Sequence, residues 1–367
     1  MKITIVAGAR PNFIKIAPVI NAIQKSIVKG ENISFRLIHT GQHYDKNMSE
    51  IFFEQLEIPN PNSNLKCGGG SQSEQTASIM IEFEKELIKY RPDIVLLFGD
   101  VNSTLACSIV SKKMNIDIAH VEGGIRSGDM TMPEEINRIV TDSISDYFFT
   151  TSETANKNLL SSGFKSKNIF FVGNTMIDTL IKNDKKFFEP KFWAKIGLIK
   201  KKYFVLTLHR PSNVDDENQL KNLIQTIIDE SNNIPIIFPA HPRTLKRLNT
   251  IGIDLKNIFI VDPMSYLEFN FLVKHSKAVI TDSGGITEEA TIMNIPCITL
   301  RDSTERPETV EFGTNELVGS LPENLPPYLR KIIKGEWKTA KKIPLWDGKT
   351  SDRIIDKLLN LYNINDQ

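Results

Sequence analysis

The sequence is poor in the features that mark several classes of protein. None of its three cysteines, Cys67, Cys107 and Cys297, stands in a CxxC pair or beside a histidine at metal-ligand spacing, so neither a zinc site nor a disulfide framework is indicated. Its 45 basic and 44 acidic residues leave a net charge of +1, without the basic excess typical of nucleic-acid partners. No apolar run approaches the length of a membrane span, and the N-terminal segment does not read as a signal peptide. These absences indicate a soluble, cytoplasmic protein that binds neither nucleic acid nor membrane.

Apolar segments of strand length alternate with longer helical patterns along most of the chain. Strands are predicted in the first half at residues 3–8, 33–39, 94–99, 116–122, 147–151 and 169–173. Helices are predicted between them, at residues 11–28, 73–90, 103–114, 134–145 and 153–162. Nearly continuous apolar strands separated by helices are typical of a doubly wound parallel sheet.

The alternation starts again after a polar and basic segment, residues 191–202. Further strands are predicted at 203–209, 234–240, 258–262, 278–282 and 297–300, with helices at 216–231, 265–275 and 284–293. A chain of 367 residues is also long for one core. We therefore predict two α/β domains in series, with a boundary near 175–200. Ligands of such sheets bind at the carboxyl ends of the strands, which favours a cleft between the domains.

The first predicted domain carries charged residues at its strand ends. Arg10 and Lys15 follow the first strand, where they can bind a phosphate, although a turn with solvated basic residues is the alternative. Asp100 follows the strand 94–99 and either caps the next helix or takes part in function. Glu122 ends another strand, before two glycines that let a chain segment or a ligand approach closely. Since a buried carboxylate is costly unless it is paired or used, Glu122 favours function.

A predicted helix that opens with Pro133-Glu134-Glu135 brings more charge to the same region. Proline and acids are ordinary residues of a first helical turn, which accounts for one of the two glutamates. Glu134, together with Asp100 and Glu122, makes a set of carboxylates that can supply an acid and a base. Arg138 follows one turn later.

Two histidines follow strands of the second predicted domain. His209 ends the strand 203–209 at a position expected to face the carboxylates of the first domain, which favours function over a structural role. His241 stands with Arg243 between two prolines, where a structural turn is the stronger interpretation.

The segment TDSGGITEEA, residues 281–290, joins an apolar strand to a helix. The backbone N–H groups expected to be free, and able to hold a pyrophosphate, are those of Ser283, Gly284 and Gly285. Glu288 and Glu289 are expected in the first turn, where they also suit the helix dipole. A carboxylate there can bind ribose hydroxyls, and Arg306 can add positive charge. The pattern favours an external nucleoside diphosphate over the helix's own carboxylates as the anion at this end.

Eight blocks of the sequence, in one order, resemble the non-hydrolysing UDP-N-acetylglucosamine 2-epimerases. Between residue 3 and about residue 320 they are GARPNFIKIAP, HTGQHYD, GDVNSTLA, HVEGGIRSGDMTMPEEINR, GNTMIDTL, LTLHRPSN, DSGGITEEA and TERPET. The resemblance implies a GT-B fold with two Rossmann-like domains, residues 1–175 and 176–350, an active site between them, and a last helix within 351–367 packed back on the first. It also implies a homodimer that makes precursors of bacterial surface polysaccharides without a metal or other cofactor.

The resemblance assigns roles to individual residues. Binding of UDP falls on Arg10, Phe269, Ser283, Gly284, Gly285, Glu289 and Arg306, with Phe269 packed on the uracil. Catalytic and sugar-side roles fall on Lys15, Asp100, Glu122, Glu134, Arg138 and His209. In the implied reaction UDP leaves first, a carboxylate removes the C2 proton to give a 2-acetamidoglucal, and UDP adds back. Which carboxylate is the base and which the acid is left open.

Some motifs depart from the family's usual form. GARPN replaces Gly-Thr-Arg-Pro-Glu, HVEGGIR replaces His-Val-Glu-Ala-Gly-Leu-Arg, and RPSN follows the histidine. These changes leave open an activating second UDP-N-acetylglucosamine near Gln42, and also UDP-2,3-diacetamido-glucuronic acid as substrate. The sequence is also compatible with a hydrolysing epimerase, a GT-B glycosyltransferase or a catalytically silent sugar-nucleotide binder. GARPNFIK and the carboxylate set favour the non-hydrolysing epimerase.

Overall fold

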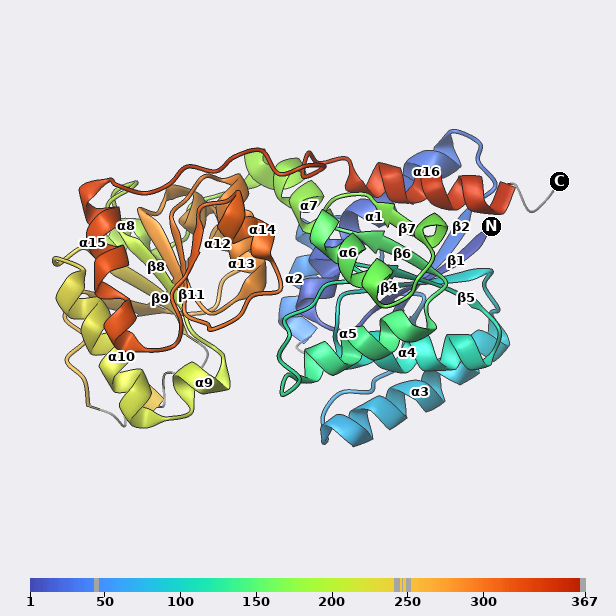
Figure 1. Cartoon of the computed structure of the whole chain (residues 1–367), viewed down its shortest axis with the longest axis horizontal. Coiled ribbons are helices and arrows are strands. Elements are labelled where there is room, and N and C mark those ends of the chain that lie inside the picture. Colours follow the sequence, from blue (N-terminus) through green and yellow to red (C-terminus); the bar gives the residue numbers. More distant parts are fainter. Residues whose placement is uncertain (43–45, 241–244, 246, 249–251, 364–367) are drawn as a thin grey trace. The chain divides into compact units, whose positions relative to one another are not determined.

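The computed structural model of the chain describes residues 1–42, 46–240, 245, 247–248 and 252–363. The chain divides into two compact units, the first made of Met1–Lys182 and Pro344–Gln367 and the second of Asn183–Ile343. Each unit is built on one parallel sheet with helices between its strands (Figure 1). The predicted α/β architecture is therefore confirmed. The turn expected at His241 and Arg243 lies outside the described residues.

The sheet of the first unit has the strand order β3-β2-β1-β4-β5-β6-β7. Its strands are β1 Lys2–Ala7, β2 Ser34–His39, β3 Ser63–Asn64, β4 Ile94–Phe98, β5 Asp117–Val121, β6 Tyr147–Thr150 and β7 Ile169–Phe171. The α-helices between and after them are α1 Arg10–Val28, α2 Lys46–Gln55, α3 Gln72–Lys89, α4 Asn102–Lys113, α5 Pro133–Ile144, α6 Glu153–Ser161 and α7 Thr175–Asn183. All five residues of β4 are buried, because helices cover both faces of a doubly wound sheet.

The sheet of the second unit has the order β10-β9-β8-β11-β12-β13. Its strands are β8 Phe204–Thr207, β9 Ile236–Pro239, β10 Ile258–Val261, β11 Ala278–Thr281, β12 Cys297–Thr299 and β13 Asn315–Leu317. The α-helices described here are α8 Phe192–Ile196, α9 Pro211–Val214, α10 Glu217–Glu230, α12 Tyr266–His275, α13 Gly284–Ile292, α14 Pro307–Glu311 and α15 Pro326–Lys334. Apolar residues of α10 and α15 pack on one face of this sheet, and those of α8 and α12 pack with strand residues in a second cluster.

The C-terminal segment of the chain belongs to the first unit. Helix α16, Thr350–Asn363, packs against α1. The carboxylate of Asp178 in α7 accepts hydrogen bonds from the backbone N–H groups of Thr350 at 3.1 Å and Ser351 at 2.7 Å. Trp346 donates its indole N–H to the carbonyl of Thr151 at 3.1 Å. These buried polar contacts fix the start of α16 on the first unit.

Several elements are not predicted from the sequence. Helices α2, α7 and α15 are among them, although α7 and α15 are amphipathic. The edge strands β3 and β13 contain two and three residues, too few to show an alternation of their own.

Candidate functional site

Both sheets have a point where the strand order reverses, and α/β proteins bind ligands at such points. In the first unit β2 and β4 flank β1, so the segments that follow β1 and β4 leave the sheet on opposite sides. Arg10 is the first residue of α1, and Asp100 lies between β4 and α4. In the second unit β9 and β11 flank β8, and the segments after β8 and β11 carry His209 and Ser283. The sequence therefore places predicted site residues at the ligand-binding edge of each sheet.

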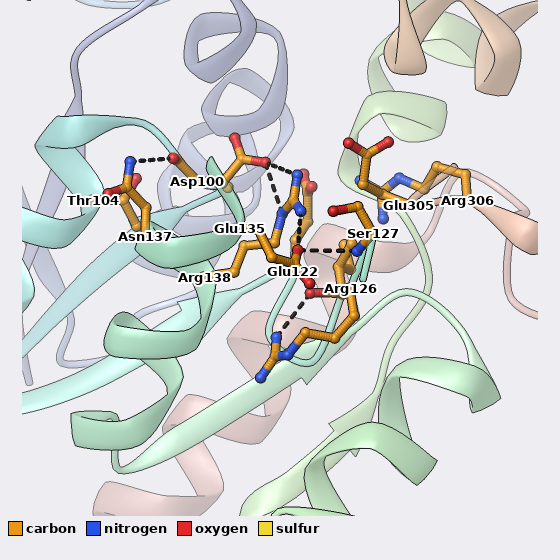
Figure 2. Close-up of polar contacts among 12 residues, drawn as sticks. Asp100, Thr104, Glu122, Arg126, Ser127, Glu135, Asn137, Arg138, Glu305 and Arg306 are labelled. Atoms are coloured by element: carbon orange, nitrogen blue, oxygen red, sulfur yellow. Dashed lines mark hydrogen bonds and ion pairs between the residues drawn. The ribbon is translucent and has the colours of Figure 1, made fainter. Parts of the chain in front are cut away.

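Asp100 is held by an arginine and does not cap a helix. Arg138 donates from Nε and Nη2 to the Asp100 Oδ2 atom at 2.9 and 2.7 Å. The N-cap residue of α4 is Val101, so the capping alternative for Asp100 is wrong. Figure 2 shows the Arg138 guanidinium between Asp100 and Glu135, to which its Nη1 donates at 2.5 Å. Both bonds from Arg138 to Asp100 end on one oxygen, which leaves the other for an incoming partner.

Glu135 ties this arginine to the loop that follows β5. Its carboxylate accepts the backbone N–H groups of Ser127 at 2.9 Å and Gly128 at 3.0 Å, and its exposed fraction is 1%. Glu135 is thus a structural residue of the first helical turn, as ordinary helix chemistry predicts for one of the two glutamates. Glu134, beside it in the first turn of α5, is half-buried.

Glu122 forms a buried ion pair with Lys15. The Lys15 Nζ atom lies 2.9 Å from Glu122 Oε1 and 3.0 Å from Oε2, and the exposed fractions of the two side chains are 10% and 3%. Glu122 also has a φ of 75°, a left-handed conformation that is uncommon for a residue with a side chain. Strained backbone and a paired buried carboxylate at a strand end are typical of a functional position.

The two glycines after Glu122 serve the packing of the protein itself. A Cβ atom on Gly124, whose φ is 79°, would lie 2.4 Å from the Ala155 carbonyl of α6. A Cβ atom on Gly123 would lie 3.0 Å from the ring of Phe148 in β6. The glycines therefore accommodate a close chain segment, which is one of the two roles that the sequence allows them.

Asn12 fixes the turn between β1 and α1. Its Oδ1 atom accepts the N–H groups of Gly8 at 3.1 Å and Ala9 at 3.0 Å. Its Nδ2 atom donates to the carbonyl of Phe98 at the end of β4, at 2.9 Å. This buried amide fixes the start of α1, and with it Arg10 and Lys15, relative to β4.

In the second unit, His209 is attached to a buried carboxylate. Its Nδ1 atom lies 2.7 Å from Asp282 Oδ1, and the side chains of the two residues are 59% and 0% exposed. Asp282 also accepts the backbone N–H groups of His209 and Arg210 and the side-chain amide of Asn213. Burial by itself would raise the pKa of Asp282, but these hydrogen bonds and the charge of His209 outweigh it and lower the pKa. The imidazole is therefore anchored through Nδ1, while more than half of the His209 side chain stays exposed.

The start of α13 differs in two ways from its prediction. The N–H group of Ser283 is not free, because it donates to Thr281 Oγ1 at 3.0 Å. Glu288 and Glu289 lie in the second turn and not the first, since α13 begins at Gly284. Among the described residues no side chain caps this helix, and a Cβ atom on Gly284 would meet no described atom closer than 3.7 Å. The backbone at the first turn therefore stays open to an anion.

Glu289 and Phe269 connect α13 with α12. The Glu289 carboxyl is buried, which raises its pKa to about 7, against hydrogen bonds with the side chains of Tyr266 and Asn270 that lower it. Phe269, in the same helix as Tyr266 and Asn270, is partly buried against the core. The residue predicted to contact ribose is thus positioned by the helix that carries the residue predicted to contact uracil.

Arg306 is a buried member of an ion pair. Its Nε atom lies 2.8 Å from Glu288 Oε1, with side-chain exposures of 7% and 1%. Its charge is therefore partly neutralised by Glu288. The local sequence does not predict this ion pair; it indicates only a favourable interaction of Glu288 with the helix dipole.

Three site-supporting residues are missed by the sequence analysis: Asp282, Asp142 and His120. Asp282 and His120 stand out weakly, as polar residues at or within apolar strands. Nothing local in the sequence indicates that Asp142, in the last turn of α5, contacts His120 and Arg126.

Known proteins share sequence and fold with this chain. The profile of the UDP-N-acetylglucosamine 2-epimerase family matches residues 25–359. The UDP-N-acetylglucosamine 2-epimerase of Methanocaldococcus jannaschii is 46% identical over 367 residues, with 97% of this chain and 98% of that protein covered. The chain belongs to the UDP-N-acetylglucosamine 2-epimerase family.

Other members extend this likeness. The UDP-2,3-diacetamido-2,3-dideoxy-D-glucuronate 2-epimerase of Pseudomonas aeruginosa is 39% identical over 369 residues, covering 98% of this chain and all of that protein. The crystal structure of the Methanocaldococcus jannaschii epimerase in complex with UDP-GlcNAc and UDP has a TM-score of 0.87 and 45% identity, with 98% and 99% of the two chains covered.

Membership confirms two predictions for this epimerase-family chain. It is an enzyme, an isomerase of the epimerase type. Its two parallel sheets form a fold of the GT-B type, like that of its structural neighbours. None of the described helices is both long enough and apolar enough to cross a membrane. The roles assigned to individual residues, the domain ranges and the cleft between the domains stay predictions.

Proposed function

We propose that the chain interconverts UDP-N-acetylglucosamine and UDP-N-acetylmannosamine by inversion at C2, without hydrolysis. The observation that carries the proposal is the arrangement around Asp100 and Glu122 at the ligand edge of the first sheet. Each of these carboxylates is oriented by a basic side chain, Arg138 or Lys15. Proton transfer to and from carbon needs carboxylates fixed in this way. The similar enzyme from Methanocaldococcus jannaschii, with UDP-GlcNAc and UDP bound, supports the substrate class.

The proposed reaction begins at C1 because the C2 proton is not adjacent to a carbonyl. The bond between C1 and the phosphate oxygen breaks, and UDP leaves with the electron pair. The resulting oxocarbenium-like sugar makes the C2 proton acidic, and a carboxylate removes it to give a 2-acetamidoglucal. A proton then returns to C2 on the opposite face, and the same UDP adds to C1. Atoms and electrons balance, and no external oxidant or water is consumed.

The base and the acid are drawn from Asp100, Glu122 and Glu134, which all belong to the first unit. The departing UDP is stabilised electrostatically by Arg10, Lys15, the N–H groups at the start of α13 and His209. Asp282 holds the His209 ring so that Nε2 can meet a phosphate oxygen. Arg138 orients Asp100 and lies on the sugar side.

The nucleotide is assigned to the second unit. Phe269 packs on the uracil, Glu289 accepts hydrogen bonds from the ribose, and Arg306 adds positive charge near the diphosphate. The uncapped start of α13 and the open space at Gly284 support this assignment, although Ser283 contributes no free N–H group.

The experiment that tests the proposal follows the sugar by proton NMR in D2O, with UDP-N-acetylglucosamine as substrate. UDP-N-acetylmannosamine with deuterium at C2 and UDP still attached is the expected product. Free N-acetylmannosamine would establish the hydrolysing reaction instead. If the substrate stays unchanged although the protein binds UDP, UDP-2,3-diacetamido-glucuronic acid becomes the proposed substrate. This is the sugar nucleotide in the name of the Pseudomonas aeruginosa relative.

We propose further that the enzyme works in the cytoplasm as a homodimer and supplies precursors of surface polysaccharides. The two Rossmann-like domains of the proposal are residues 1–175 with 351–367, and 176–350. Sedimentation of the purified protein tests the dimer, with a monomer mass of 41.5 kDa as the reference.

A further inference from the structure

His120 is a fully buried histidine in the middle of the carboxylate-bearing edge of the first sheet. It lies in β5, two residues before Glu122, and its exposed fraction is 0%. Its Nδ1 atom lies 2.7 Å from Asp142 Oδ1, and its Nε2 atom lies 2.8 Å from the carbonyl oxygen of Gly99. Gly99 joins β4 to Asp100, so the ring links the ends of two neighbouring strands.

Both ring nitrogens of His120 thus face hydrogen-bond acceptors. A carbonyl oxygen can only accept, and an ionised carboxylate can only accept. A neutral imidazole has one N–H group, so one of its lone pairs would point at an oxygen within 2.8 Å. Inside a protein such a contact is strongly unfavourable. Both contacts, with Asp142 and with the Gly99 carbonyl, are hydrogen bonds only when both ring nitrogens carry a proton.

The surroundings of Asp142 fit a charged partner. Its Oδ2 atom lies 2.7 Å from Arg126 Nη1 and accepts the N–H group of Gly124 at 3.0 Å. Burial would raise the pKa of Asp142, but the charges and hydrogen bonds of His120 and Arg126 outweigh it and lower the pKa. Donors therefore meet its Oδ2 atom, and a protonated His120 nitrogen would supply one to its Oδ1 atom.

One more charged group lies close to the second contact of the ring. A Cβ atom built on Gly99 would lie 2.8 Å from Lys15 Nζ, so the ammonium that pairs with Glu122 also touches this turn. The charged groups around the ring are thus Asp142 and Arg126 on one side, and Lys15, Asp100 and Glu122 beyond Gly99 on the other.

We propose that His120 is held as an imidazolium and is a positioning residue for the two carboxylates, Asp100 and Glu122. Its Nε2–H group fixes the Gly99 carbonyl, and with it the φ of 67° that turns the chain into Asp100. Its Nδ1–H group anchors β5 to Asp142 and to the loop that begins at Glu122. The inference rests on the proposed function for the roles of the two carboxylates, but the charge state of the ring does not.

The first test is an NMR titration of the wild-type protein labelled with 15N-histidine, from pH 6 to 8.5. The other five histidines are replaced one at a time by glutamine to identify their signals. We expect both His120 nitrogens to keep the chemical shifts and attached protons of an imidazolium at pH 7.5. Shifts of a neutral tautomer at pH 7 would overturn the imidazolium, whatever reaction the enzyme catalyses.

The second test uses two variants that each keep one donor. The amide of H120N can replace Nδ1 and reach Asp142, whereas that of H120Q can replace Nε2 and reach the Gly99 carbonyl. We expect kcat to fall by about 10- to 100-fold in H120N, because the turn at Asp100 is released, and to fall less in H120Q. The dissociation constant of UDP should stay within about twofold in both, since the assigned nucleotide contacts do not include this ring.

Wild-type kcat in H120N, or a larger loss in H120Q than in H120N, would overturn the positioning role. A side chain with only a packing role would lower the free energy of unfolding in both variants without separating their kcat values. If neither variant folds, the titration of the wild-type protein still decides the charge state. Lack of epimerase activity in the wild-type protein would count against the proposed function and leave the titration result standing.

Discussion

The two units differ in how they hold charged side chains at the ligand-binding edge of a sheet. In the first unit the pairs are mostly buried: the side chains of Lys15 and Glu122 are 10% and 3% exposed, and those of Arg138 and Asp100 are 5% and 29%. In the second unit the anchor Asp282 is buried, but the His209 side chain is 59% exposed. The start of α13 is also left without a side-chain cap among the described residues.

This difference separates proton chemistry from anion binding. Burying an ion pair carries a large desolvation penalty, which is offset only when geometry and hydrogen bonds are good. In the first unit this desolvation penalty is offset by the pairing, and the carboxylates are oriented before a substrate binds. The second unit leaves the His209 side chain and the start of α13 accessible to a phosphate, although its Arg306 is buried in an ion pair with Glu288. The predictions below test this division, from the largest expected effect to the smallest.

Asp100→Asn should abolish turnover and spare nucleotide binding. The amide keeps the size of the side chain but cannot accept a proton, so kcat should fall by about 10³-fold. Turnover is measured with the deuterium-exchange assay, and UDP binding by calorimetry. Asp356→Asn, a neutralised carboxylate on the exposed face of α16, is the matched control and should behave like the wild type. A variant with normal kcat, or one that no longer binds UDP, would contradict the division between the units.

Glu289→Gln should change the pH dependence of stability. The Glu289 carboxyl is buried, and its pKa is raised from 4.5 to about 7. The folded state therefore keeps a proton that the unfolded state has lost, and stability falls as pH rises from about 4.5 to about 7. This fall, on the order of 3 kcal/mol for a shift of this size, should be absent in the variant.

Urea denaturation of both proteins at pH 5 and pH 8 makes the comparison. Subtracting the variant removes the contributions of all other titrating groups. Equal changes in the free energy of unfolding in the two proteins would show that Glu289 ionises normally.

Asp282→Asn should act through His209. The carboxylate of Asp282 accepts hydrogen bonds on both of its oxygens, whereas an asparagine amide has only one oxygen and turns its NH2 group toward the other donors. The His209 imidazole should therefore lose its orientation. We expect kcat to fall between about 10- and 100-fold, as for other residues that orient a functional side chain. In the background of His209→Ala the same change should have little further effect on kcat, because the two losses share one cause. Additive losses would show that Asp282 acts by another route.

Arg306→Lys should weaken UDP binding without affecting the chemical step. Lysine keeps the charge but lacks the planar fork of the guanidinium. The dissociation constant of UDP should rise about tenfold, or ~1.4 kcal/mol, while kcat at saturating substrate stays close to normal. Arg330→Lys is the matched control, since Arg330 pairs with Glu230 at an exposed site. A decrease in kcat without a change in the dissociation constant of UDP would show that Arg306 acts in the chemical step and not in binding.

The sequence predicts the sheets better than the contacts at their edges. Strands such as β4 and β11 are continuous apolar runs, and local composition is enough to locate them. The position of Asp100 is also readable, but its partner Arg138 is 38 residues away. Local chemistry alone therefore favours helix capping and functional use equally. Tertiary contact decides between them.

The errors at α13 have a similar origin. Two glycines followed by acids suggest an open helix end, and the helix does begin there. Whether Ser283 has a free N–H group depends on Thr281, and whether Arg306 is available depends on Glu288. The likeness to the epimerase family predicts which residues form the site, whereas their pairing is visible only in the fold.

The return of the chain to its first unit has a consequence for synthesis. Residues 183–343 are an insertion within the unit that contains both Lys2–Ala7 and Thr350–Asn363. During synthesis the strands of the N-terminal sheet leave the ribosome early. The Asp178 carboxylate can bind the N–H groups of Thr350 and Ser351 only after the whole inserted unit has been made. Contacts this distant in sequence are slow to form. The inserted unit can therefore acquire its own sheet first, and the docking of α16 becomes the closing event of folding.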